Sequence, residues 1–387
     1  MQLSIITNIH NKTNNTMQYD IKCPNGLKLF DPLITQTRPE LPKEYLWPKL
    51  EENNVILELN EPLIDLSGFY KGDEESTKKA AMLINKACIS HGIFQVTNHG
   101  VDSDLIREAE DGMEGVFKMP MEKKLRLQRK QGDLCGYSGA HTDRFSKQLP
   151  WKETFSFAYD YLHDDHDQIV VDYVKNELGQ EFEHLGWVYQ KYCEAMKKVS
   201  LAIFELLAIS LGVERRHYKN FFEDGSSILR CNSYPPCNEP GSTYGTGPHC
   251  DPTSLTILHQ DQVGGLQVFA NNKWHAITPR HGALVINIGD TFMALTNGKY
   301  KSCLHRAMVN KDKLRRSLAF FVNPAKDKVV RPPLDLVPTK EGTLCRTYPD
   351  FKWSHLLEFT QKHYRADVTT LQHFFLWLPS HFGFTLS

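Results

Sequence analysis

The sequence predicts an α+β protein in which helices come first, a β-rich core follows, and a further helix ends the chain. Apolar residues recur at helical spacing in three stretches between Lys78 and Leu211. From 226 to 322 the pattern changes to short runs of Val, Ile, Leu and Phe separated by turn residues. A last amphipathic stretch begins at Trp353. Short strands at such regular turn spacing are typical of a β-sandwich or a β-barrel.

The first expected helix begins near Lys78, and one of its faces is apolar through Ala81, Ile84, Ala87 and Cys88. Gly92 stands where a glycine commonly ends a helix. The next residues, IFQV, are rich in β-formers and predict a short strand.

A second helix is expected after the turn Asn98-His99-Gly100, with an apolar face formed by Leu105, Ile106, Ala109, Met113 and Phe117. Met119-Pro120 should end it, because proline cannot continue a helix. A third, longer helix is expected from about Phe182 to Leu211, and Gly212 follows it.

These patterns divide the chain into four parts. They are a variable leader over 1–52, an N-terminal subdomain over 53–165, a β-rich core over 225–325 and a C-terminal helix and tail over 350–387. The β-rich core contains turn pairs such as Pro235-Pro236, Gly264-Gly265 and Asn271-Asn272.

Composition excludes several classes of protein. Over 387 residues, 45 Lys and Arg against 46 Asp and Glu give a net charge of −1, so neither nucleic acid nor an acidic membrane is an expected partner. No apolar run approaches the roughly 18 residues of a membrane span, and the first residues do not read as a secretion signal. Nine cysteines without a Cys-x-x-Cys pair indicate a reducing, cytoplasmic compartment.

A His-x-Asp pattern can offer an imidazole and a carboxylate to one metal ion, because alternate residues of a strand share a face. It occurs four times, at His141/Asp143, His163/Asp165, His249/Asp251 and His259/Asp261. The 249/251 pair lies within the β-rich core, before the apolar run 255–258. The first two pairs lie in polar loops, and the last adjoins the Gly264-Gly265 turn, so we interpret them as ordinary loop and hairpin residues.

A third metal ligand is expected at His305, which follows Asp251 after 53 intervening residues. Nine further residues separate His305 from the sequence Arg315-Arg316-Ser317. Arg-x-Ser also occurs at Arg144-Phe145-Ser146, so the specific signal is the ordered set of His-x-Asp, His and Arg-x-Ser within one β-rich segment.

On this ordered set the sequence resembles the plant Fe(II)/2-oxoglutarate-dependent dioxygenases, over nearly the whole chain. The resemblance implies a double-stranded β-helix, or jelly roll, as the core. It implies iron held by His249, Asp251 and His305, a triad that leaves three coordination positions for 2-oxoglutarate and O₂.

The resemblance also implies a cosubstrate pocket. A guanidinium can bind the far carboxylate of 2-oxoglutarate through two hydrogen bonds, which is the role implied for Arg315 with Ser317 beside it. Asn232 and Tyr234 match the family's Asn-Tyr-Tyr-Pro-Pro-Cys signature, from which Ser233 departs. We expect Ser233 to face away from the pocket.

Within this class the sequence is most similar to the gibberellin 20-oxidases, through LPWKETFSF, HCDPTSLTILHQDQVGGLQVF, NIGDTFMALTNGKYKSCLHRA and FTQKHYRAD. The resemblance implies stepwise oxidation of the carbon-20 methyl of a gibberellin to alcohol and aldehyde, then its loss with lactone closure. Each step would consume one 2-oxoglutarate and one O₂, with ascorbate as a stimulating cofactor. A small-molecule gibberellin is thus the expected partner, and the protein is expected to be a monomer.

The resemblance associates LPWKET with the substrate, and a diterpenoid acid needs an apolar cup with a cation beside it. We therefore expect Lys152, Trp151 and Arg144 to bind the substrate, with Phe155 and Phe157 as further walls. Two alternatives remain open at this stage. One is a plant oxygenase of the same fold acting on a flavonoid or another gibberellin carbon. The other is a non-catalytic zinc-binding barrel in which Cys250 or Cys303 assists the histidines.

Overall fold

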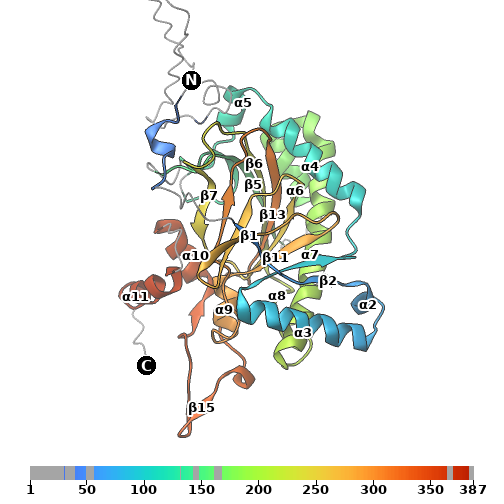
Figure 1. The fold of residues 1–387 in the computed structure, drawn as a ribbon, viewed down its shortest axis with the longest axis vertical. Helices are drawn as coiled ribbons and strands as arrows, with labels where there is room; N and C mark the ends of the chain where they lie inside the picture. The colour runs from blue at the N-terminus through green and yellow to red at the C-terminus, as the bar shows by residue number, and fades with distance from the viewer. Residues whose placement is uncertain are drawn as a thin grey trace, which may run out of the picture.

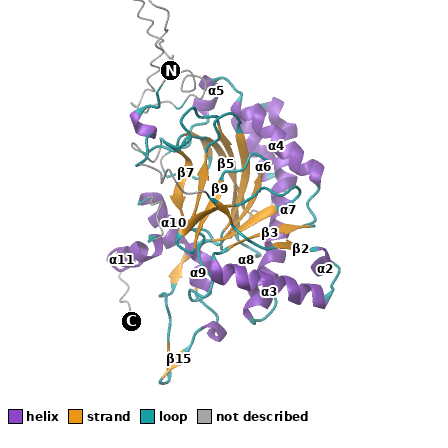
Figure 2. Ribbon diagram, viewed as in Figure 1, coloured by secondary structure: helices purple, strands orange, loops and turns teal. Residues whose placement is uncertain are grey.

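The computed structural model describes residues 30, 40–48, 56–130, 132–142, 148–160, 168–363 and 369–382. Two β-sheets face each other, and helices cover the outer face of the larger one (Figures 1 and 2). This arrangement confirms the α+β prediction. None of the described helices is long and apolar enough to cross a bilayer.

The larger sheet has eight strands in the order β2-β3-β11-β8-β13-β6-β5-β4. Their bounds are Leu63–Asp65 (β2), Ile93–Thr97 (β3), Leu284–Ile288 (β11), Leu255–Gln260 (β8), Arg315–Val322 (β13), Ser226–Tyr234 (β6), Glu153–Asp160 (β5) and Gly136–Gly139 (β4). Strands from the first half of the chain therefore extend the same sheet as strands of the β-rich core.

The smaller sheet has five strands in the order β1-β10-β9-β12-β7. Their bounds are Leu57–Glu58 (β1), Lys273–Ala276 (β10), Leu266–Ala270 (β9), His305–Met308 (β12) and Tyr244–His249 (β7). From β6 to β13 the chain alternates between the two sheets, apart from the β9–β10 hairpin, and this is the predicted jelly roll. Asn271 and Asn272 turn that hairpin with φ of 52° and 61°, a left-handed conformation that asparagine tolerates.

The helices lie mainly on the outer face of the larger sheet. Their bounds are Ser67–Tyr70 (α2), Glu74–Ser90 (α3), Ser103–Phe117 (α4), Met121–Arg126 (α5), Ile169–Leu178 (α6), Glu183–Leu211 (α7), His217–Phe222 (α8), Asp290–Leu295 (α9), Trp353–Lys362 (α10) and Thr370–Phe382 (α11). Helices α3, α4, α6 and α8 pack against α7, and the main hydrophobic core fills the space between them and the sheet.

Short elements complete the described fold. Strands β14 (Val329–Val330) and β17 (Phe351–Lys352) pair with each other, as do β15 (Thr339–Lys340) and β16 (Thr343–Leu344), and 3₁₀ turns cover Lys43–Tyr45, Gln180–Phe182 and Leu334–Leu336.

The helix ends follow from local chemistry. Helix α3 begins four residues before the predicted start, because the Asp73 side chain accepts the N–H groups of Glu75 and Ser76. Helix α7 ends at Gly212, whose φ of 74° is the left-handed conformation expected of a glycine cap. Helices α6, α8 and α11 were not predicted, although Val170, Val174 and Leu178 give α6 an apolar stripe.

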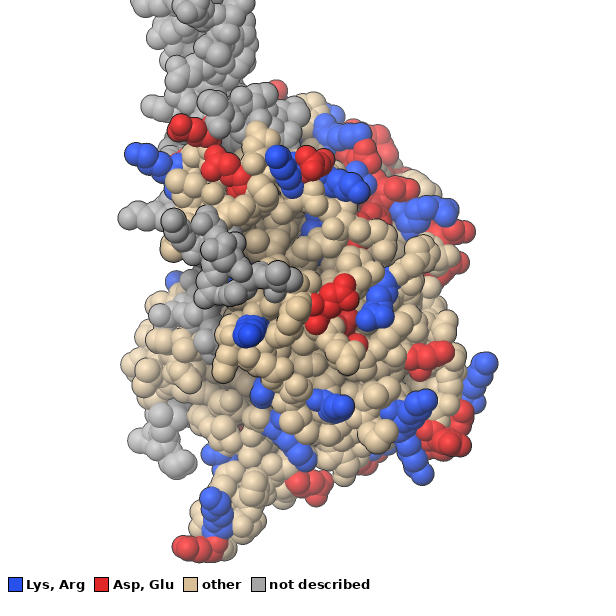
Figure 3. Space-filling view, in the orientation of Figure 1, with Lys and Arg blue, Asp and Glu red and all other residues tan. Residues whose placement is uncertain are grey.

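Charged side chains of both signs are mixed over the described part of the face shown in Figure 3. No extended patch of a single sign appears among the described residues on that face. This agrees with the near balance of charges in the sequence.

One half-buried histidine should make the fold sensitive to acid. Burial, aided by the nearby Lys301, lowers the pKa of His91 at the end of α3 to about 4. Between the usual value of 6.5 and 4 the unfolded chain therefore binds more protons than the folded chain, so stability falls as pH falls through this range. We expect the urea midpoint of His91→Gln to drop less between pH 7 and pH 5 than that of the unaltered protein. Equal drops in the two proteins would contradict this assignment.

Candidate active site

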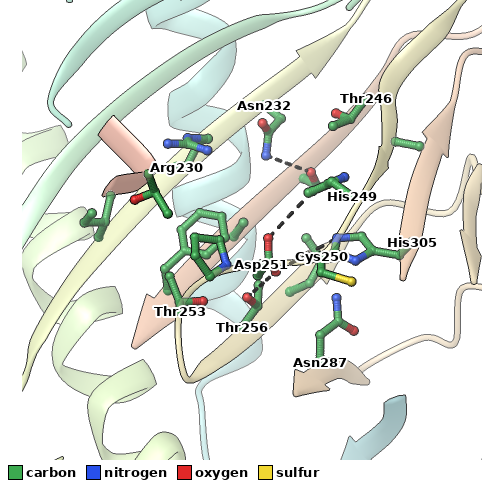
Figure 4. Close-up of a pocket in the computed structure, with 18 of the residues that line it drawn as sticks. Arg230, Asn232, Thr246, His249, Cys250, Asp251, Thr253, Thr256, Asn287 and His305 are labelled. Atoms are coloured by element: carbon green, nitrogen blue, oxygen red, sulfur yellow. Dashed lines mark hydrogen bonds and ion pairs between the residues drawn. The ribbon is translucent and has the colours of Figure 1, made fainter. Parts of the chain in front are cut away.

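Three predicted metal ligands meet between the two sheets. His249 is the last residue of β7 and His305 the first of β12, and the two are paired across these strands. Asp251 lies two residues after the end of β7. Its Oδ1 lies 3.6 Å from His249 Nε2, and its Oδ2 lies 3.9 Å from His305 Nε2. One ligand atom from each residue lies within 4.8 Å of the others (Figure 4).

Neighbouring groups orient all three side chains. His249 Nδ1 lies 2.8 Å from the Gly247 carbonyl oxygen, and His305 Nδ1 lies 2.9 Å from that of Cys303. A carbonyl only accepts hydrogen bonds, so each Nδ1 carries the proton and each Nε2 offers a lone pair to the centre of the triad. The Thr256 hydroxyl donates to Asp251 Oδ2 at 2.6 Å.

The protonation states suit a divalent metal. Burial, with the adjacent His305, lowers the pKa of His249 to about 3, so this imidazole is neutral. Burial opposes ionisation of Asp251, but His305, His249 and the Thr256 hydroxyl together hold the pKa of its carboxyl below the usual value. Two imidazoles and one carboxylate on one side of a cavity are the donor set of non-haem iron(II).

The triad opens into a cavity lined by both sheets and by α10. About 170 Å³ of this cavity admits the centre of a water molecule, whereas one water needs only ~10–15 Å³, so a small organic molecule can enter. One wall of the cavity is formed by the paired strands β6 and β13, and their register gives the order of residues along it. In that order the pairs are Tyr234 with Arg315, Asn232 with Ser317, and Arg230 with Ala319. Thr256, which donates to Asp251, pairs with Phe321 on β13, two residues beyond the partner of Arg230.

Arg315 lies at one end of the cavity with 1% of its surface exposed. Its Nη2 donates to Gln260 Oε1 at 3.1 Å, but its Nε and Nη1 have no hydrogen-bond partner among the described residues. Asn232 Nδ2 donates to Ser317 Oγ at 3.2 Å beside it. A buried guanidinium with two unused donors requires an anionic partner, and a carboxylate accepts both donors at once.

Lys152 also reaches this end. It is 4% exposed, its Nζ donates to Thr246 Oγ1 at 3.0 Å, and Nζ lies 5.9 Å from the centre of the Tyr234 ring. The Arg315 guanidinium lies 4.9 Å from the centre of the same ring. Two cations therefore lie close to Tyr234.

Both apolar and polar residues line the rest of the cavity. Ile228, Phe321 and Arg230 line it from the larger sheet, Trp353, Leu357, Thr360 and Gln361 line it from α10, and Asn323 lines it directly after β13. Arg230 Nε donates to Ser156 Oγ at 3.1 Å, and its guanidinium lies 5.1 Å from the centre of the Phe321 ring. Sequence analysis did not single out Arg230, because an arginine in a strand reads as an exposed charge.

The structure separates the predicted substrate residues. Lys152 lines the cavity, but Trp151 does not, since its indole N–H donates to the Pro235 carbonyl and its ring packs against Phe30 and Tyr45. Phe155 and Phe157 lie in the hydrophobic core on the helix side of the sheet. The expectation that these three aromatics wall the cup was wrong. Arg144 lies outside the described residues.

The remaining predictions from the motifs can also be placed. Ser233 pairs with Glu153 and Arg316 and is not among the residues that line the cavity, as expected. His259 contacts Glu110 at 3.1 Å, and Asp261 accepts the Arg316 N–H and, at 3.0 Å, the Val263 N–H, so this pair is structural. Neither of the other two His-x-Asp pairs is described in full, because Asp143, His163 and Asp165 lie outside the described residues.

The cysteine alternative finds no support in the described residues. The group of potential ligands there consists of His249, Asp251 and His305, without a cysteine. Cys303 instead offers its backbone carbonyl to His305, and burial raises the pKa of its thiol well above the usual value, which disfavours the thiolate that zinc requires.

Thr256 is a supporting residue that the sequence analysis missed, and it allows a prediction. We expect Thr256→Val to weaken metal binding by about 10- to 100-fold, the usual cost of losing a hydrogen bond that orients a ligand. Thr253→Val is the matched control, because Thr253 lines the same cavity and its hydroxyl has no partner among the described residues. Calorimetric titration with Fe(II) under nitrogen measures both, and equal affinities would contradict the role given to Thr256.

Comparison with known proteins gives consistent results. Residues 225–324 match the model of the 2OG-Fe(II) oxygenase superfamily, and residues 62–178 match that of the non-haem dioxygenase in morphine synthesis N-terminal domain. Gibberellin 20 oxidase 3 of Arabidopsis thaliana is 52% identical over 366 residues, which cover 94% of this chain and 96% of that protein. Gibberellin 20 oxidase 2 of Oryza sativa subsp. japonica is 51% identical over 88% of this chain and 86% of its own.

A solved structure extends the likeness to three dimensions. The crystal structure of JOX2 in complex with 2OG, Fe and JA superposes with a TM-score of 0.74 at 29% identity, and covers 88% of this chain and 95% of that one.

Proposed function

Because the chain belongs to the gibberellin 20-oxidases of the 2OG-Fe(II) oxygenase superfamily, we propose that it oxidises carbon 20 of a gibberellin with 2-oxoglutarate and O₂. The observation that carries this proposal is the juxtaposition, in one cavity, of the His249–Asp251–His305 triad and the buried, partly unpaired guanidinium of Arg315. A metal site alone would serve many functions, whereas a metal site with a built carboxylate pocket indicates a keto-acid cosubstrate.

The triad holds Fe(II) through the Nε2 atoms of His249 and His305 and a carboxylate oxygen of Asp251. Bound iron supplies the activation of O₂, coupled to the oxidation of 2-oxoglutarate to succinate and CO₂. Thr256 and the carbonyl groups of Gly247 and Cys303 fix the directions of the three ligands.

Arg315 binds the far carboxylate of 2-oxoglutarate through Nε and Nη1, the two donors without a partner in the described protein. Ser317 and Asn232, already hydrogen-bonded to each other, and the Tyr234 hydroxyl complete the cosubstrate end of the cavity. The keto-acid end of the same molecule then points along the strands toward the triad.

Each turnover places one oxygen atom of O₂ in succinate and uses the other to oxidise the substrate, and each consumes one 2-oxoglutarate. The methyl group becomes an alcohol, and the alcohol becomes an aldehyde with release of water. Further oxidation of the aldehyde releases carbon 20 as a one-carbon product, at the level of formic acid for one more 2-oxoglutarate and O₂ or of CO₂ for two, while a carboxylate oxygen of the gibberellin bonds to the ring carbon that carried it and closes the lactone. The apolar residues beyond the triad exclude water and hold the hydrocarbon cage against the metal.

Product analysis tests the proposal. The purified protein is incubated with Fe(II), ascorbate, 2-oxoglutarate and a panel of gibberellins that retain carbon 20, and products are identified by mass spectrometry. We expect masses for the alcohol, the aldehyde and the lactone in sequence. A flavonoid panel and gibberellins that already lack carbon 20 serve as controls, and oxidation of these alone would refute the assignment.

We also propose that the enzyme acts as a monomer in the cytoplasm. None of the eight described cysteines forms a disulfide with another described residue, which suits a reducing compartment. Light scattering coupled to size-exclusion chromatography and the distribution of a fluorescent fusion test these two points.

A further inference from the structure

We propose that Arg230 binds a carboxylate of the substrate, whereas Lys152 serves the cosubstrate end of the cavity. This inference rests on the proposed function and refines it. It also reverses the sequence-based assignment of Lys152, which followed from its place in LPWKET rather than from its surroundings.

The pairing of β6 with β13 gives the positions of residues along the cavity. Tyr234, Asn232 and Arg230 alternate along β6, and their partners on β13 are Arg315, Ser317 and Ala319. At about 3.4 Å per residue, Arg230 lies ~7 Å beyond Asn232 and ~13 Å from Tyr234 along the strand. In Figure 4, Arg230 and Thr246 flank Asn232 on opposite sides.

Lys152 lies near Tyr234, at the Arg315 end of this row of residues. Its Nζ is fixed by Thr246 at 3.0 Å and lies over the ring that Arg315 also approaches. Thr246 pairs with Ala307, two residues from His305 along β12. Lys152 therefore lies beside the space that a dianionic keto acid fills between Arg315 and the metal.

Arg230 lies at the end of this row away from Tyr234 and Arg315. Its Nε donates to Ser156 Oγ, and its guanidinium lies 5.1 Å from the centre of the Phe321 ring. These contacts set the plane of the guanidinium, so a carboxylate can approach its edge with two hydrogen bonds. Its charge also reaches Asp251, where it favours the ionised carboxylate.

The surroundings of Arg230 match the proposed substrate. Ile228, Phe321, Trp353 and Leu357 line the cavity together with Arg230, and the polar residues Asn323, Thr360 and Gln361 line it beside them. A gibberellin precursor is a rigid hydrocarbon cage that carries carboxylates. If a carboxylate is held at Arg230, the cage lies against these apolar side chains and one of its faces is turned toward the triad.

Reciprocal substitutions separate the two cations. Arg230→Gln and Lys152→Gln each remove a charge while keeping a polar side chain, and each serves as the control for the other. We expect Arg230→Gln to raise the gibberellin KM by roughly 10- to 150-fold, the range for a lost hydrogen bond between charged groups, with the 2-oxoglutarate KM changed less than about twofold. Lys152→Gln should show the opposite pattern.

Two measurements make the test independent of turnover and of folding. Anaerobic titration of the Fe(II)-loaded variants with 2-oxoglutarate, followed by absorbance, should show weaker binding in Lys152→Gln alone. Thermal unfolding establishes that both variants are folded. Arg230→Lys should recover part of the affinity, because it restores the charge but not the paired donors.

Esterified substrates identify the contact directly. A gibberellin with one carboxylate as its methyl ester should lose affinity for the unaltered enzyme but lose little more with Arg230→Gln, because the two changes remove the same interaction. Fully additive losses for every monoester, or a larger rise in gibberellin KM with Lys152→Gln, would overturn the inference. If the unaltered enzyme oxidises no gibberellin, the proposed function fails instead, so the two failures are distinguishable.

Discussion

Replacement of Asp251 by asparagine is expected to abolish turnover and to weaken Fe(II) binding by more than ~100-fold. Loss of a group that merely orients a ligand costs up to about 100-fold, and loss of the only charged ligand must cost more. Asparagine keeps the size of the side chain and can still accept the Thr256 hydrogen bond. The loss would therefore report the missing negative charge between two imidazoles and not a collapsed loop.

Asp261→Asn is the matched control for this substitution. It changes the same residue type in the other described His-x-Asp pair, where the carboxylate accepts backbone N–H groups of Val263 and Arg316. Anaerobic calorimetry with Fe(II), and thermal unfolding with and without the metal, should show normal metal affinity for this variant. Equal metal affinities in Asp251→Asn and Asp261→Asn would refute the triad.

The metal triad could be predicted from sequence because its three residues leave a periodic and ordered signal. His249 and Asp251 are spaced to share a face, and His305 begins a strand that pairs with the strand His249 ends. The same holds for Arg315 and Ser317, whose alternation on β13 places both on the cavity side. Sequence spacing thus determined which side chains converge once the two sheets were in place.

The walls of the substrate cavity could not be predicted, because the usual rule for strands is inverted there. An apolar face of a strand normally faces the core, and on β5 it does, since Phe155 and Phe157 pack against the helices. The alternate residues of β5, Thr154 and Ser156, pair with Asn232 and Arg230 of β6. They therefore share the face of these two residues, which line the cavity. In a barrel that encloses a polar cavity, polar residues point inward, so Arg230 could not be distinguished from a surface residue.

The second large effect is expected at Arg315. Arg315→Ala should raise the 2-oxoglutarate KM by roughly 100-fold or more while leaving Fe(II) affinity unchanged. One hydrogen bond to a charged group is worth about 1.5–3 kcal/mol, and the geometry offers two. The substitution also leaves the far carboxylate of the cosubstrate buried without its guanidinium partner, which adds part of the cost of desolvating that charge.

Arg316→Ala is the natural comparison, because adjacent residues of a strand point to opposite faces. Arg316 Nη2 donates to Glu114 of α4 at 2.8 Å on the outer side of the sheet, in a half-buried ion pair away from the cavity. Cosubstrate KM and anaerobic binding of 2-oxoglutarate should therefore be normal in this variant.

Arg315→Lys should recover only part of the affinity, since an ammonium restores the charge without the two parallel donors. Similar cosubstrate affinities in the two alanine variants would show that 2-oxoglutarate does not lie along β13, and the order of the whole cavity, including the place of Arg230, would have to be reversed.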